Sequence, residues 1–169
     1  MAELTPSQTI GPFFYEGLRW AIDAGPRDFG VPVVRVTGCV FDADGQPVPD
    51  ALLEIWQPGL TATAYPGSHL PGFQRVDTRE GGRFEFFVPH PDAGPAEAHV
   101  TVFARGLLNG LFTRVYLPAS SGVPVSLPEA VPAARRDTLI AKRCERHPGT
   151  WLWDVHLQGE RETVFFSFA

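Results

Sequence analysis

The sequence has little positive charge. Its 169 residues include 14 basic and 19 acidic side chains, which give a formal net charge of −5. A nucleic-acid-binding domain of this size is expected to carry a basic excess or a basic stripe. The two basic pairs, at 135–136 and 142–143, are each flanked by an acidic residue and are typical of a solvated surface. The composition therefore excludes nucleic acid as the expected partner.

Long apolar runs, an apolar leader and cysteine clusters are also missing. No stretch approaches the roughly 18 apolar residues that a membrane helix needs, and residues 1–5 have neither the basic start nor the apolar core of a signal peptide. Cys39 and Cys144 are 105 positions apart, which is no metal-ligand or redox spacing. We expect a cytoplasmic chain without membrane contact, in which both cysteines are reduced and buried.

Glycine and proline, by contrast, are abundant, at 17 residues each. So many turn-formers disfavour a helix bundle and are typical of short strands joined by tight turns. A chain of this length buries enough surface to fold as one domain without disulfides or metals. The composition predicts an all-β protein.

Alternation of apolar and polar residues predicts about nine short strands after residue 32. We interpret 73–78 with 83–88, and 99–105 with 111–117, as hairpins, and 118–132 as an exposed loop. The fold expected for residues 33–169 is an antiparallel β-sandwich. The expected strands are 33–41, 51–57, 73–78, 83–88, 99–105, 111–117, 137–142, 151–157 and 162–168.

Residues 1–32 show no sustained period. The segment 5–12 contains two prolines, which push their predecessors into extended conformations. Phe13, Phe14, Tyr15 and Trp20 follow, and this is more apolar surface than a monomer leaves in water. We therefore predict an N-terminal arm that packs on the body of the chain or on a partner subunit.

No spacing motif identifies a catalytic site. The five histidines lie more than four residues from one another, and the Asp-Ala-Asp-Gly sequence at 42–45 favours a turn over a calcium loop because its glycine comes too early. Composition and spacing alone leave open a stand-alone transthyretin-like or carbohydrate-binding β-sandwich without catalysis.

Six segments, at 5–13, 38–57, 103–106, 112–116, 136–141 and 158–166, resemble the intradiol ring-cleaving dioxygenases. The last four resemble most closely the α-subunit branch of that family, found in the protocatechuate 3,4-dioxygenases. The resemblance implies an enzyme of α and β subunits in which O₂ cleaves 3,4-dihydroxybenzoate to 3-carboxy-cis,cis-muconate. It also implies a non-haem Fe(III) held by two tyrosines and two histidines, since tyrosinate oxygens are hard anionic donors for ferric iron.

The sequence departs from the family pattern where the two histidines are expected as His-x-His on a strand. Glu97 stands at the first position and His99 at the second, and residues 86–94 contain no tyrosine. Tyr65 is the remaining match to a ligand tyrosine. The resemblance therefore implies a vestigial site here and iron in the partner β subunit. A single-chain dioxygenase with an altered ligand set is the less favoured alternative.

The same resemblance assigns four residues to the substrate pocket of the partner subunit. They are Thr9, Gly11, Pro12 and Arg105. Glycine and proline suit a backbone that closely approaches an aromatic ring. A guanidinium suits a pocket that admits a benzoate carboxylate. Without the resemblance, the favoured interpretation of Arg105 is a sheet-edge arginine in a surface ion pair.

Overall fold

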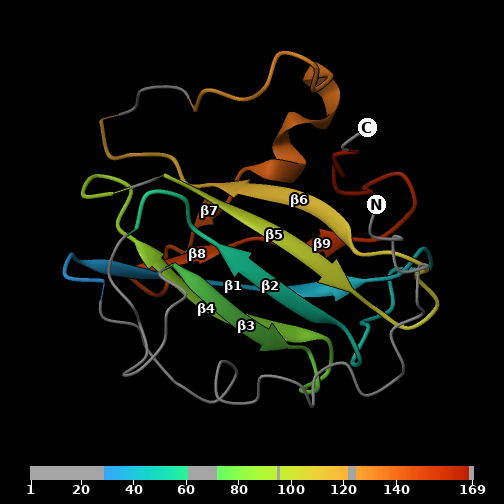
Figure 1. Ribbon diagram of the computed structural model, residues 1–169. Helices are drawn as coiled ribbons and strands as arrows, with labels where there is room; N and C mark the ends of the chain where they lie inside the picture. The colour runs from blue at the N-terminus through green and yellow to red at the C-terminus, as the bar shows by residue number, and fades with distance from the viewer. Residues whose placement is uncertain (1–28, 61–71, 95, 122–124, 168–169) are drawn as a thin grey trace, which may run out of the picture.

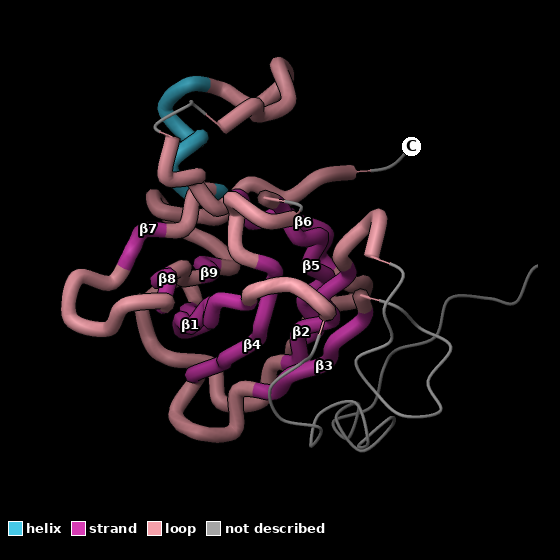
Figure 2. The backbone as a smooth tube through the Cα atoms, turned by 90° about the vertical axis from the view of Figure 1, so that its left-hand side faces the viewer, coloured by secondary structure: helices cyan, strands magenta, loops and turns pink. Residues whose placement is uncertain are grey.

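The computed structural model describes residues 29–60, 72–94, 96–121 and 125–167, and these form a sandwich of two sheets (Figure 1). Figure 2 shows the two layers from the side. The all-β sandwich predicted from the sequence is confirmed. One sheet has the order β4 (Arg83–Pro89), β1 (Val33–Phe41), β8 (Thr150–Leu152), β7 (Lys142–Arg143), with β9 (Val155–His156) also paired to β1. The other has the order β3 (Phe73–Asp77), β2 (Leu52–Trp56), β5 (Glu97–Phe103), β6 (Leu111–Tyr116).

The core lies between the two sheets and follows the alternation of the strands. On β1, Val34, Val36 and Val40 are each at most 3% exposed, whereas Arg35 between them is half-buried on the other face. The same alternation on β4 extends this layer, and the inward residues of β2 and β5 supply the facing layer. The inward residues belong to one continuous apolar cluster, which includes Leu53, Ile55, Phe84, Phe86, Val88, Ala98, Val100, Val102, Trp151, Trp153 and Val155.

The segments 73–78 and 83–88 do not form the hairpin predicted from the sequence. β3 pairs with β2 in one sheet, and β4 pairs with β1 in the other. The connection therefore crosses between the layers, and the buried side chain of Gln74 joins them. Its amide donates from Nε2 to the carbonyl of Phe87 at 2.5 Å and accepts at Oε1 from the Phe87 N–H at 3.0 Å. The second predicted hairpin, β5 with β6, is confirmed.

The predicted strand 151–157 is interrupted after Leu152. Both of its parts, β8 and β9, run parallel to β1, and Trp153 and Asp154 between them bond to β1 differently. The Trp153 N–H donates to the carbonyl of Thr37 at 3.0 Å, and the Asp154 carboxylate accepts from the Cys39 N–H at 2.9 Å. A Cβ on Gly38 would lie 1.7 Å from the Trp153 carbonyl oxygen, so this close approach of two backbones requires glycine.

Two further predicted strands are wrong. The first half of the segment 137–142 lies in the 3₁₀ helix η2 (Ala133–Leu139), which follows Pro132, and the strand that comes next is only the two-residue β7. The fixed φ of proline suits the residue that precedes a helix. Leu139 is fully buried against Tyr116 and Val131, and this produced the strand-like alternation.

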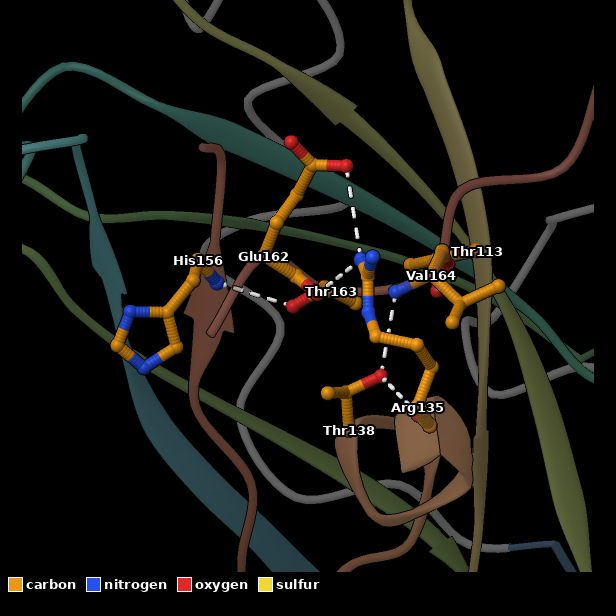
Figure 3. Close-up of polar contacts among 7 residues, drawn as sticks. All are labelled: Thr113, Arg135, Thr138, His156, Glu162, Thr163 and Val164. Atoms are coloured by element: carbon orange, nitrogen blue, oxygen red, sulfur yellow. Dashed lines mark hydrogen bonds and ion pairs between the residues drawn. The ribbon is translucent and has the colours of Figure 1, made fainter. Parts of the chain in front are cut away.

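Residues 162–166 run beside β6 without forming a strand, and side chains of η2 hold them there (Figure 3). Thr138 Oγ1 accepts from the Val164 N–H at 3.2 Å, and Arg135 Nη2 donates to the Glu162 carbonyl at 2.6 Å. Thr113 on β6 donates to the Val164 carbonyl at 2.7 Å, and Phe166 forms a single bridge to Phe112. Side-chain donors and acceptors thus replace the ladder that a strand would have needed.

The expectation for the two cysteines is met only in part. Cys39 and Cys144 are free thiols, but both are half-buried, whereas buried side chains were expected. The 42–45 segment is a turn, as predicted, in which Asp42 Oδ1 accepts from the N–H groups of Asp44 and Gln46 at 3.0 and 2.8 Å.

The predicted N-terminal arm lies outside the described residues except for 29–32. Among the described helices, none has the length and apolarity to span a bilayer.

Candidate functional site

Two polar side chains of β5 face away from the core of the sandwich. Ala98 and Val100 are at most 1% exposed in the core. Alternate residues of a strand lie on opposite faces, so Glu97 and His99 share the outer face. Their side chains are 33% and 39% exposed. The two positions of the expected His-x-His pattern therefore lie on one face of β5.

Arg114 completes a charged cluster with these two residues. The strand registers place His99 between Trp56 on β2 and Arg114 on β6. Arg114 Nη1 lies 3.9 Å from Glu97 Oε2, and His99 Nε2 lies 3.6 Å from Glu97 Oε1. The guanidinium also stacks 5.6 Å above the ring centre of Phe166, which limits its freedom to move. The Glu97 carboxylate thus lies between a permanent cation and an imidazole.

Tyr116 lies directly opposite Glu97 on β6. Its side chain packs with Leu139 and Val131, and its burial raises the pKa of the phenol above its ordinary value of 10.0, although a hydrogen bond with Arg114 acts in the other direction. Tyr116 is therefore a neutral phenol at physiological pH, whereas a metal-binding tyrosine is a phenolate.

Sequence reasoning missed Arg114 and Tyr116. The period-two pattern of residues 111–117 already places them on one face with Phe112. The pattern does not give the β5–β6 register, which pairs Tyr116 with Glu97 and Arg114 with His99. A hairpin with a known loop would have given that register.

Arg105 lies at the other end of the sheet from this cluster. It follows β5 and is six residues beyond His99, or roughly 20 Å at about 3.3 Å per residue. Its side chain is 70% exposed, and its Nε lies 2.9 Å from Asp50 Oδ2. The structure therefore does not bring Arg105 together with Glu97 and His99. The other residues predicted for the pocket or for the vestigial metal position, Thr9, Gly11, Pro12 and Tyr65, lie outside the described residues.

Two relatives match the chain over nearly its whole length. The "Protocatechuate 3,4-dioxygenase alpha chain" of Burkholderia cepacia is 38% identical over 96% of this chain and 96% of its own length. The protein of the same name from Pseudomonas putida is 34% identical over 97% and 96%.

The chain belongs to the protocatechuate 3,4-dioxygenase α-chain family. The members of this family are subunits of oxidoreductases, and the family belongs to the intradiol dioxygenases. The resemblance of the six sequence segments to the intradiol dioxygenases is thereby confirmed. No protein-family model matches the sequence.

A solved structure shares the fold of the chain. The dioxygenase domain of a dioxygenase–carbohydrate-binding protein fusion from Streptomyces sp. SirexAA-E superposes with a TM-score of 0.52 at 23% identity. The match covers 93% of this chain and 99% of that domain. At this identity the likeness concerns the fold alone.

Intradiol dioxygenases are non-haem iron enzymes, so a ferric site in this chain would need suitable donor side chains close together. Glu97 and His99 supply two donors, and the buried His99 Nε2 has no hydrogen-bond partner among the described residues. The guanidinium of Arg114, however, already compensates the carboxylate and repels a further cation at close range. Within the described part of the chain, no three His, Cys, Asp or Glu side chains gather at one point. The described donors do not fit a four-ligand ferric site.

Proposed function

We propose that this chain is the non-catalytic α subunit of a protocatechuate 3,4-dioxygenase, an assembly that uses O₂ to cleave 3,4-dihydroxybenzoate to 3-carboxy-cis,cis-muconate. The Fe(III) of the holoenzyme belongs to the β subunit, and the α chain contributes scaffold and a wall of the substrate pocket. The single observation that carries the proposal is the Glu97–Arg114 pair, because a guanidinium that already compensates this carboxylate disfavours a ferric ion there.

The position of Arg105 supports the pocket-wall role. The residue lies beyond the end of β5, six positions after His99, with most of its side chain in solvent. A cation there has no part in a site built on Glu97 and His99. An exposed arginine at this edge is accessible to a partner chain, and a guanidinium suits the carboxylate of 3,4-dihydroxybenzoate.

The proposed division of the chain follows. Residues 1–32 form an arm that packs on the β subunit and carries Thr9, Gly11 and Pro12 to the substrate, while residues 33–169 form the sandwich. The α and β subunits assemble as pairs into a larger hetero-oligomer in the cytoplasm, without nucleic acid or membrane.

The proposal is tested by iron analysis of the chain alone and of the chain co-expressed with a β chain. The chain alone is expected to be colourless, iron-poor and inactive, and the co-expressed pair to show the visible absorption of tyrosinate–Fe(III) together with ring cleavage. Stoichiometric ferric iron in the chain alone, or ring cleavage by it, would contradict the proposal. In the Glu97→His variant, Arg114 still opposes the metal, so this variant is also expected to remain colourless.

A further inference from the structure

Asp50 and Arg105 meet at one edge of the sandwich although 55 positions separate them in the chain. Leu52 at the start of β2 pairs with Phe103 at the end of β5, so the turns that precede β2 and follow β5 lie side by side (Figure 1). Across this edge Arg105 Nε approaches Asp50 Oδ2 to 2.9 Å.

The turn that carries Asp50 is tightly held. The hydroxyl of Thr78, which is fully buried, donates to the carbonyl of Val48 at 2.7 Å and accepts from the Ala51 N–H at 2.9 Å. The Thr78 N–H in turn donates to the Ala51 carbonyl at 3.1 Å. Asp50 is therefore a fixed carboxylate, with its side chain 26% exposed.

Arg105, by contrast, begins a turn. Ala104 before it is 6% exposed, and Gly106 after it has φ of +90°, so the backbone leaves the sheet at this point. An exposed arginine samples many rotamers, and ordering it for a ligand costs conformational entropy. The ion pair with Asp50 is the contact that limits this freedom within the described residues.

The geometry of the ion pair determines which N–H groups of the Arg105 guanidinium can bind a second anion. Arginine presents five N–H groups in a planar fork, and carboxylates bind well to two parallel N–H groups at once. Asp50 lies on the Nε atom. The two terminal Nη groups at the far end of the fork remain for a second anion.

We propose that Asp50 is a positioning residue, which orients Arg105 so that its terminal nitrogens receive the carboxylate of an aromatic acid in a pocket completed by the partner subunit. The inference rests on the proposed function, since Arg105 must border that pocket. Asp50 touches no substrate and acts only through Arg105.

The test uses the enzyme assembled from this chain and a β chain, with steady-state kinetics on 3,4-dihydroxybenzoate and on catechol, which has no carboxylate. The variants are Asp50→Asn, Arg105→Ala and the double variant. Asp50→Asn is expected to raise KM for 3,4-dihydroxybenzoate about two- to fivefold at unchanged kcat, the range of a partly exposed ion pair. Catechol turnover and the unfolding midpoint should be unaffected. In the Arg105→Ala background, Asp50→Asn should add nothing.

A matched control is Glu85→Gln, which removes a carboxylate from an arginine on the opposite sheet, where Arg35 Nη1 lies 3.2 Å from Glu85 Oε2. It should leave both KM values unchanged. If Arg105→Ala raises KM but Asp50→Asn leaves it unchanged or lowers it, Asp50 does not position Arg105, and the proposed function stands. If Arg105→Ala itself has no effect, the pocket-wall role fails, and this inference fails with it. Equal losses on both substrates would show that Asp50 only supports the fold.

Discussion

The Glu97 carboxylate on β5 lies 3.9 Å from the guanidinium of Arg114 on β6. This ion pair lies at the strand position where the resemblance to the intradiol dioxygenases implies a histidine ligand. Both side chains are about one-third exposed, so the pair contributes little to stability, on the order of 0–1 kcal/mol. Its consequence is electrostatic, because the permanent positive charge of Arg114 lies beside the Glu97 carboxylate and opposes the binding of a further cation there.

The first prediction concerns Arg105. In the assembled enzyme, Arg105→Ala should raise KM for 3,4-dihydroxybenzoate more than it lowers kcat, because a lost carboxylate contact weakens substrate and transition state alike. A direct charge-assisted contact is worth about 1.5–3 kcal/mol, which corresponds to a roughly 10- to 150-fold loss in kcat/KM. The kcat/KM for catechol, which has no carboxylate, should be nearly unchanged. Equal losses on both substrates would mean that Arg105 supports the fold or the subunit interface.

The second prediction concerns the N-terminal arm. Deleting residues 1–20 removes Phe13, Phe14, Tyr15 and Trp20, which are the kind of side chains that obligate interfaces bury. Association with the β chain, measured by co-purification, should be lost, while the β-sheet signal in circular dichroism should largely remain. Co-purification of the truncated chain at full strength would show that the arm is not the contact.

The third prediction compares two buried glutamines. Gln57 and Gln74 are each 1% exposed. Both amide atoms of Gln57 are without a hydrogen-bond partner among the described residues, whereas those of Gln74 pair with the Phe87 backbone. Gln57→Met should therefore raise the free energy of unfolding, because it removes buried polar atoms that cost about 1–3 kcal/mol.

Gln74→Met is the matched control and should lower the free energy of unfolding by about 1–3 kcal/mol, since it leaves the Phe87 N–H and carbonyl unsatisfied. Denaturant unfolding of the two variants measures both changes. The same sign for both substitutions would contradict this account of the core.

The fourth prediction concerns pH. Burial and the nearby positive charge of Arg161 lower the pKa of His156 below its ordinary value of 6.5, although Asp154 opposes the shift. Between the lowered pKa of the folded state and 6.5, the unfolded chain binds more protons, so stability falls as the pH is lowered through this window. The stability that the neutral imidazole contributes is fully present above 6.5.

His156→Gln should flatten this part of the curve, which is measured as the unfolding midpoint from pH 8 down to pH 5 for both proteins. The difference between the two proteins isolates His156 from the carboxylates, which titrate in both. A His156→Gln protein with the same pH dependence as the parent would contradict the assignment.

The sequence by itself determined the class of fold and the family. Period two in the strands places Val34, Val36 and Val40 on one face whatever their partners are, because side chains alternate in any strand. The proposal that Glu97 stands at a ligand-histidine position likewise comes from the sequence and needs no coordinates. The strand pattern failed at 137–142, where Leu139 is buried by a helix and not by a sheet.

Only the tertiary structure decided which strands are neighbours and therefore which charges meet. Arg114 faces Glu97, and Asp50 faces Arg105, through strand registers that join residues 17 and 55 positions apart. The crossing of β3 and β4 between the layers was equally invisible, because a tight turn at 79–82 suits either a hairpin or a change of sheet. Local patterns fix which face a side chain takes, whereas pairing depends on the packing of distant segments.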